Sequence, residues 1–315
     1  MAPDSDVPGQ PGGGPQTADD PDFAAYARDL TGRAARANAE GTIPAPWAAN
    51  LVVLRRVEST NAIGRRILDE YAEEGEAVPE LALVAWEQDA GKGRGGKSWS
   101  SPAGAGVWMS VVRPVAKPAE MPTLPLLVPV AVARTVNRFA GEGRCRIKWP
   151  NDLLVDERKV AGLLLAGVAG RQGGARSRTA SGGGAGVVIG VGVNHGQSEA
   201  ELAELTPQGT RGAVSLAQIL DDPPTLADFA WALIEDLARE LAHAGDGPEA
   251  VRRYRALSLH EAGERLRCSA AGETLEGTFR GFDSRGFLRL ELTSSGGGRQ
   301  IGEEVLVTAG EVVSP

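Results

Sequence analysis

The fold and the chemistry of this chain both depend on the stretch QDAGKGRGGKSWSSPAGAG, from Gln88 to Gly106. Four glycines and three cations, Lys92, Arg94 and Lys97, lie within its first twelve residues. Glycines allow the backbone to approach a ligand closely and to turn its N–H groups toward it. The stretch therefore predicts a loop that binds an anion, either a phosphate or a carboxylate.

The same loop satisfies the P-loop pattern G-x-x-x-x-G-K-[ST] between Gly91 and Ser98, and the acidic segment Leu153–Glu157 resembles the magnesium-binding strand of that fold. A P-loop must continue directly into a helix, because the helix N-terminus holds the phosphates. Here Pro102 and Gly104 follow within a few residues, and both oppose a helix. The sequence therefore argues against a P-loop nucleotidase. A solvated glycine-rich loop without a ligand stays open for this segment alone.

Outward from the loop, predicted strands and helices alternate without the strict order of a βαβ series, which predicts an α+β fold with a mixed sheet. Helical spacing of apolar residues predicts one helix after Ser59–Asn61, whose polar side chains can cap it, and two more over Leu124–Phe139 and Leu226–Leu241. Apolar runs predict seven strands, over Leu51–Val57, Leu81–Glu87, Gly106–Val112, Cys145–Trp149, Leu153–Val155, Val160–Ala169 and Val187–Val193.

The pattern changes after Leu259, where short strands and glycine-rich turns follow one another. The strands are predicted over Glu264–Ser269, Leu275–Phe282, Phe287–Leu292 and Gln300–Val307. This spacing predicts a small β-barrel over residues 259–315.

Two other stretches have low complexity. Residues 1–45 are rich in Pro, Gly and Ala, and apart from a weak helical pattern over Pro21–Ala39 they predict a flexible tail. Residues 170–186 predict a flexible insertion between two strands. The main domain is therefore expected over residues 46–258.

The composition excludes several classes of protein. The net charge of −8 opposes a dedicated DNA-binding protein, which usually carries a basic face. The two cysteines, Cys145 and Cys268, form no CxxC pair and the three histidines are scattered, so we expect no zinc site. No apolar run reaches the roughly 18 residues of a membrane span, and the start of the chain does not resemble a signal peptide. These features predict a cytoplasmic protein.

Two further segments place polar groups at strand ends. In IKWPND, a predicted strand delivers Lys148, Pro150 ends it, and Asn151 starts a turn. In VVIGVGVNH, a strand that contains two glycines ends at Asn194, a short amide that can bind a ligand. Each segment alone also fits a bland alternative, namely a solvated lysine at a strand edge or an ordinary turn.

Taken together, the segments resemble the biotin–protein ligase family. The resemblance rests on five blocks in order and, with the predicted barrel, extends from Leu51 to the end of the chain. The blocks are ESTN at Glu58–Asn61, Gln88 with GKGRGGKSW, KWPND at Lys148–Asp152, KVAG at Lys159–Gly162 and GVGVN at Gly190–Asn194.

The resemblance implies a class II synthetase-like catalytic domain with a mixed sheet, followed by an SH3-like barrel. Some members of the family carry an N-terminal helix-turn-helix domain that represses biotin genes. The residues before the first block are few and rich in Pro and Gly, so we expect neither that domain nor operator binding.

The family's binding residues carry over to matching positions. Arg94 and Lys148 would supply the catalytic charge. Biotin would contact Ser59, Thr60, Asn61, Gln88, Lys92, Gly93, Arg94, Lys148 and Gly162. The adenylate would contact Gly91, Lys92, Arg94, Lys97, Trp99, Asn151 and Asn194. The family loop usually reads GRGRxGR, so Lys92 and Lys97 replace two arginines and Gly95 replaces a larger residue; lysine keeps the charge but loses the planar fork.

The resemblance also implies the reaction and its partners. ATP, with Mg²⁺ bound to it and not to a protein motif, would activate biotin as biotinyl-5'-AMP, and a lysine of a biotin carboxyl carrier domain would then receive the biotin. We expect no membrane partner, and a monomer or a homodimer. Two alternatives stay open: a lipoate or octanoyl ligase or transferase of the same fold, and a non-catalytic regulator that binds biotin.

Overall fold

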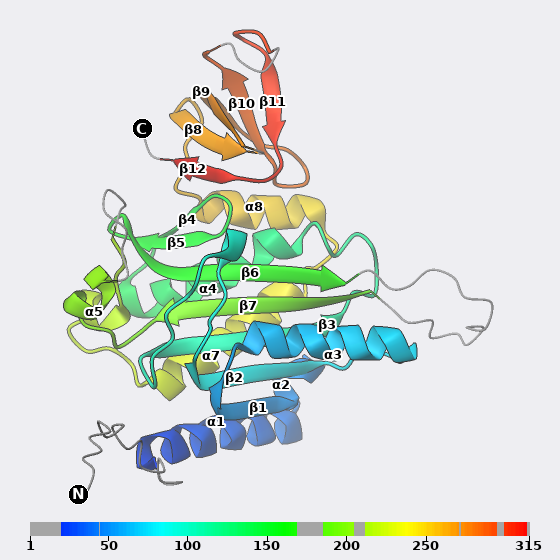
Figure 1. Ribbon diagram of the computed structural model, residues 1–315, viewed down its shortest axis with the longest axis vertical. Coiled ribbons are helices and arrows are strands. Elements are labelled where there is room, and N and C mark those ends of the chain that lie inside the picture. The colour runs from blue at the N-terminus through cyan, green and yellow to red at the C-terminus, as the bar shows by residue number, and fades with distance from the viewer. Residues whose placement is uncertain are drawn as a thin grey trace, which may run out of the picture.

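The computed structural model describes residues 20–43, 45–168, 185–204, 212–270, 272–294 and 299–313 of the chain. Nearly all of the predicted 170–186 insertion and the first 19 residues of the predicted tail therefore lie outside the described residues. Figure 1 shows one large sheet with its helices and, at one end, a second, smaller sheet.

Seven strands form the larger sheet, in the order β1-β2-β3-β7-β6-β5-β4 (Figure 1). β1 and β2 run parallel, and the other neighbouring pairs are antiparallel, so the predicted mixed sheet is confirmed. The seven predicted strands are also confirmed, with small shifts at their ends. They are β1 (Leu51–Val57), β2 (Leu81–Gln88), β3 (Gly106–Pro114), β4 (Cys145–Lys148), β5 (Asp152–Val155), β6 (Arg158–Val168) and β7 (Gly186–Asn194).

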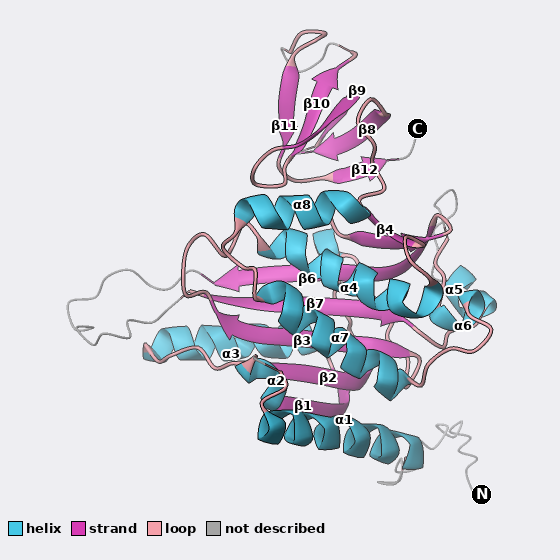
Figure 2. Cartoon of the chain, turned by 180° about the vertical axis from the view of Figure 1, so that it is seen from behind, coloured by secondary structure: helices cyan, strands magenta, loops and turns pink. Residues whose placement is uncertain are grey.

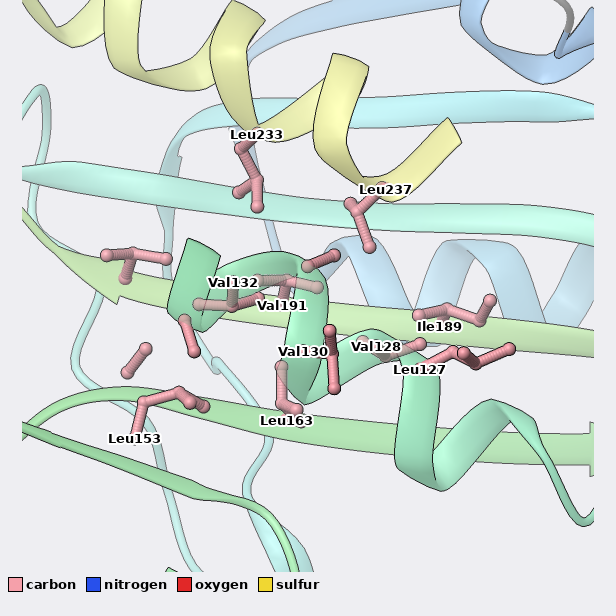
Figure 3. Packing of buried hydrophobic residues seen from close by; sticks show 14 of the residues in the cluster. Leu127, Val128, Val130, Val132, Leu153, Leu163, Ile189, Val191, Leu233 and Leu237 are labelled. Atoms are coloured by element: carbon pink, nitrogen blue, oxygen red, sulfur yellow. The ribbon is translucent and has the colours of Figure 1, made fainter. Parts of the chain in front are cut away.

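Helices cover both faces of this sheet, as the two opposite views show (Figures 1 and 2). α4 (Leu124–Ala140) and α7 (Leu226–Leu241) lie on one face, and α3 (Thr60–Glu74) lies on the other. In the main core, Leu233 of α7 and Val191 of β7 point into one buried cluster (Figure 3). The three predicted helices are therefore confirmed, and the sheet is an internal layer.

The start of α3 is fixed close to the centre of the sheet. The Ser59 hydroxyl accepts a hydrogen bond from Ala62 N at 3.4 Å, which caps the helix as predicted. A Cβ at Gly64 would lie 2.9 Å from Val188 Cγ1, so only glycine lets α3 approach β7 this closely. This close packing places Thr60 and Asn61 directly over the sheet.

The smaller sheet is antiparallel, in the order β11-β10-β9-β8-β12. Its fifth strand was missed because three residues are too few to show a period. The predicted strand over Gln300–Val307 begins only at Glu304, so that boundary was wrong. The sheet agrees with the expected SH3-like barrel. Its strands are β8 (Arg265–Ala270), β9 (Glu273–Phe282), β10 (Leu288–Leu292), β11 (Glu304–Val307) and β12 (Glu311–Val313).

The weak helix predicted over Pro21–Ala39 is confirmed as helix α1 (Pro21–Glu40), so this part of the predicted 1–45 tail is helical and not flexible. Asp20 caps it by accepting hydrogen bonds from Asp22 N and Phe23 N, and a left-handed Gly41 ends it. One side of α1 is buried through residues at helical spacing, namely Tyr26, Leu30, Ala34 and Ala37. Alanine contributes little to an apolar pattern, so this stripe was weak in the sequence. The sequence also missed α2 (Pro46–Ala49), α5 (Glu199–Glu204), α6 (Leu216–Ile219) and α8 (Gly247–Leu257).

None of the helices in the described part of the chain combines the length and the apolar character that crossing a bilayer requires.

Candidate active site

The register of the larger sheet places Lys148 in one row with two glycines. Lys148 pairs with Asp152, Asp152 pairs with Gly162, and Gly162 pairs with Gly192. Directly paired residues point to the same face of a sheet. Ile147, next to Lys148, is fully buried in the main core, so the row faces away from α4 and α7.

Three glycines form a patch without side chains on this face. Gly162, Gly190 and Gly192, which we call the glycine patch, lie on the neighbouring strands β6 and β7. A Cβ at Gly190 would lie 2.7 Å from Asn61 Nδ2, and a Cβ at Gly192 would lie 2.6 Å from Trp99 Nε1. The missing side chains therefore let Asn61 and Trp99 lie against the backbone of the sheet.

The glycine-rich loop folds back on itself beside this patch. Gly93 N donates to Lys97 O at 2.7 Å, and Trp99 N donates to Gly91 O at 2.9 Å. Only a short 3-10 turn over Arg94–Gly96 lies within it, and no helix follows. The rejection of the P-loop is therefore confirmed, because no helix N-terminus is available to hold phosphates here.

A buried polar network joins α3 to the start of the loop. The Gln88 side-chain oxygen accepts hydrogen bonds from Thr60 N at 2.8 Å and from the Thr60 hydroxyl at 3.2 Å. The Gln88 side-chain nitrogen donates to the Ser101 hydroxyl at 2.8 Å, and the Ser110 hydroxyl donates to the Thr60 hydroxyl at 2.8 Å. Sequence reasoning missed Ser101 and Ser110, although a serine in the middle of the apolar strand GVWMSVV was a usable signal.

Two cations bind the turn that follows Lys148. Arg94 Nη1 donates to Asn151 Oδ1 at 2.6 Å, which joins the glycine-rich loop to the KWPND turn that follows Lys148. Lys159 Nζ lies 2.7 Å from Asp152 Oδ1 and 5.3 Å from the centroid of the Trp99 ring. Arg94 and Lys159 are thus joined to Asn151 and Asp152, in the KWPND segment that also contains Lys148.

Lys97 is held from the smaller sheet. Its ammonium lies 3.1 Å from Glu311 Oε1 on β12, and this hydrogen bond, with the charges of Lys97, Arg94 and Lys159, lowers the pKa of Glu311. The pKa of this carboxyl group responds to cations from the glycine-rich loop and from β6, which indicates that positive charge is concentrated there.

The remaining predicted residues have clear positions. Lys92 is exposed, and its backbone forms an isolated antiparallel β-bridge with Ser98 across the loop. Asn194 is buried at the end of β7, where its amide donates to Lys159 O at 3.4 Å and to Val214 O at 3.3 Å. The role of Asn194 toward a nucleotide stays a prediction, since its donors are engaged within the protein.

Within the described residues, no group of three or more His, Cys, Asp or Glu side chains is placed to hold a metal ion. Both cysteines are buried, and burial raises the pKa of Cys145 to about 12 and that of Cys268 to about 11. Trp99 Nε1 is buried and has no hydrogen-bond partner among the described residues. This atom lies against the backbone at Gly192, where a Cβ would be only 2.6 Å from it.

The known proteins that are similar to this chain include protein ligases. A model of the Biotin/lipoate A/B protein ligase family matches residues 53–194. A biotin--[acetyl-CoA-carboxylase] ligase of Mycobacterium tuberculosis is 32% identical over 269 residues, which cover 84% of this chain and 88% of that protein. The bifunctional ligase/repressor BirA of Salmonella typhimurium is 36% identical over 146 residues, and the match covers 46% of this chain and only 40% of that relative.

Solved structures share the fold. The biotin protein ligase from Aquifex aeolicus in complex with biotin and ATP has a TM-score of 0.59 at 20% identity, and the match covers 84% of this chain and 97% of that one. The biotin protein ligase from Leishmania major in complex with biotinyl-5-AMP has a TM-score of 0.51, also at 20% identity. The expected α+β architecture is therefore found in solved proteins with low sequence identity to this chain.

Proposed function

Because the chain belongs to the biotin/lipoate A/B protein ligase family, we propose that it is a biotin–protein ligase. In this proposal the enzyme joins biotin to ATP as biotinyl-5'-AMP and then transfers biotin to a lysine of a carrier protein. One observation carries the proposal: Arg94 and Lys159 bind the neighbouring residues Asn151 and Asp152, at the sheet face to which Lys148 also points.

The glycine patch and its neighbours are suited to biotin. The polar N-terminus of α3, with Ser59, Thr60 and Asn61, offers hydrogen bonds to a ureido group, and Gln88 lies beside it. Trp99 offers an apolar ring with an unsatisfied N–H. This combination of a few polar groups and an aromatic wall is typical of small-molecule sites. We therefore assign the biotin rings to the space beside Trp99 and the N-terminus of α3, both of which lie against the glycine patch.

Positive charge offsets the electrostatic repulsion between the two anionic reactants of the first step. A carboxylate oxygen of biotin attacks the α-phosphorus of ATP, the new O–P bond forms, and the bond to pyrophosphate breaks. Both reactants are anions, so positive charge aimed at them stabilises the transition state. We assign this role to Arg94 and Lys148. No general base is needed, since the nucleophile is already ionised.

The loop supplies the remaining contacts with the adenylate. We assign Gly91, Lys92, Gly93 and Lys97 to the phosphate and the biotin carboxylate, and Trp99, Asn151 and Asn194 to the nucleotide side. These loop residues lie in one folded segment, closed by the hydrogen bonds from Gly93 N to Lys97 O and from Trp99 N to Gly91 O. A loop that covers the mixed anhydride would also exclude water and slow its hydrolysis.

In the second step the amine of a carrier lysine attacks the acyl carbon and AMP leaves. A lysine is mostly protonated at neutral pH, because its pKa in solution is about 10.4. The carboxylate of Asp152 lies on the same face, but Lys159 already binds it at 2.7 Å. We therefore assign no base to this step.

The partners follow from the chemistry of the reaction. The carrier is proposed to be the biotin carboxyl carrier domain of a biotin-dependent carboxylase. Mg²⁺ is proposed to arrive with ATP. The described residues offer no metal site, so we assign it no protein ligand and derive no step through it.

Pyrophosphate release in the presence of biotin, ATP and a purified carrier domain tests this function. The wild-type protein should release pyrophosphate only with biotin, and Lys148→Ala should lower that rate at least about 100-fold while the protein stays folded, because a charge used in the transition state is lost. Release with lipoate or octanoate but not with biotin would favour the related acyl ligases. Biotin binding without any release would indicate a regulator.

A further inference from the structure

The segment between the two sheets adds to the edge of the larger one. After α8 the chain passes through Ser258, Leu259 and His260 before it reaches β8. Ser258 pairs in parallel with Ile147 of β4, and Leu259 N donates to Ile147 O at 2.8 Å. Since β4 is the edge strand of the larger sheet, this linker continues the ladder beyond it.

His260 extends this ladder with its side chain. Trp149 N donates to His260 Nε2 at 3.2 Å. A backbone N–H can only donate, so Nε2 of His260 carries no proton and acts as the acceptor. The His260 side chain is 3% exposed and Trp149 is 4% exposed, so water is poorly placed to replace this acceptor.

These two hydrogen bonds hold the peptide groups on both sides of Lys148. Ile147 O belongs to the peptide that precedes the Lys148 Cα, and Trp149 N belongs to the peptide that follows it. The linker therefore fixes the planes of the two peptide groups that flank Lys148. The pairing of Lys148 with Asp152 fixes the position of β4 against β5. Together these contacts determine the direction of the Lys148 Cα–Cβ bond.

The smaller sheet holds His260 from the other side. The His260 ring lies 6.0 Å from the ring of Phe279 in an edge-to-face arrangement, and Phe279 is almost completely buried in β9. His260 Nδ1 lies 3.6 Å from Glu264 Oε2. The position of the imidazole therefore depends on the smaller sheet being folded against the linker.

We propose that His260 is a positioning residue for Lys148, and that through it the smaller sheet takes part in adenylation. This inference rests on the proposed function, in which Lys148 acts on the biotin carboxylate and the α-phosphate. A displacement of about 1 Å is enough to cost on the order of 100-fold in rate. Loss of the acceptor should therefore lower kcat, while KM changes little because Lys148, and not His260, is the group assigned to the reactants.

Three variants test this role. His260→Leu removes the acceptor, whereas the amide oxygen of His260→Gln can still accept from Trp149 N. Val307→Ala is the matched control, because Val307 is almost completely buried in the smaller sheet and pairs with Leu288, so the change weakens that sheet away from Phe279. Steady-state pyrophosphate release is measured at a temperature at which each variant is folded by circular dichroism.

We expect kcat to fall about tenfold or more in His260→Leu, with KM for biotin and ATP within about twofold of wild type. His260→Gln should recover kcat to within about threefold, and Val307→Ala should behave like wild type. A wild-type kcat in His260→Leu, or a loss in His260→Gln as large as in His260→Leu, would overturn the inference. If His260→Leu does not fold, His260→Phe keeps a ring on Phe279 without an acceptor and should show the same loss.

Hydrogen exchange of the Trp149 amide gives a readout that is independent of activity. Exchange should accelerate in His260→Leu and stay slow in His260→Gln. If wild-type protein released no pyrophosphate with biotin, the proposed function would fail while this exchange pattern still held. Equal exchange in all the proteins, with normal wild-type turnover, would remove the positioning role alone.

Discussion

Three glycines shape the candidate active site through the side chains that they lack. Gly162, Gly190 and Gly192 allow the Trp99 indole and the Asn61 amide to reach the sheet. None of them has a left-handed backbone conformation, so what requires glycine at these positions is space and not backbone freedom. A substitution that adds one methyl group to this patch therefore tests whether the ligand binds beside it.

Gly192→Ala should raise KM for biotin about tenfold or more, because the added Cβ would lie 2.6 Å from Trp99 Nε1 and force the indole to move. Gly196→Ala is the control, since the nearest atom to its added Cβ is 3.9 Å away, an ordinary contact. Titration of initial rates with biotin measures both. Unchanged KM in Gly192→Ala would place biotin elsewhere.

At the scale of elements, helix α1 makes the N-terminal segment part of the core. Leu30 is fully buried, and Arg33 lies 2.7 Å from Asp228 at the start of α7. Burial of one side of α1 against the sheet and α7 gives this segment a stabilising contribution that a flexible tail would lack.

Leu30→Ala should lower the free energy of unfolding by about 2–5 kcal/mol, since it removes buried methyl groups and leaves a cavity. Arg28→Ala, on the exposed side of the same helix, should change it by less than about 0.5 kcal/mol. Urea denaturation of the two variants measures the difference. Equal stability of both would mean that α1 does not pack against the core.

At the scale of the whole molecule, local patterns were predictable and distant pairings were not. Periodicity predicted the seven strands and the helices α3, α4 and α7, because it depends only on neighbouring residues. The pairing of Lys97 with Glu311 joins residues 214 positions apart, and that of Arg94 with Asn151 joins residues 57 apart. No local pattern encodes such contacts, so the resemblance and not the periodicity predicted that the cations meet.

The division of the chain near residues 258 and 259 stays a proposal, as do the oligomeric state and the absence of operator binding. The linker at this point belongs to both sheets, since Ser258 pairs with β4 while His260 lies against Phe279 of β9. The two sheets are therefore expected to act together in adenylation and not as independent units.

We propose that cations from separate segments surround two anionic reactants beside Trp99 and the glycine patch. A crystal structure of the protein with biotinyl-5'-AMP would show this arrangement. We predict the Arg94 guanidinium and the Lys148 ammonium both within about 4 Å of the phosphate or the acyl oxygens, the distance of an ion pair, with the biotin rings in contact with Trp99. A ligand that contacts neither cation, or one that lies away from Trp99, would show that this proposal is wrong.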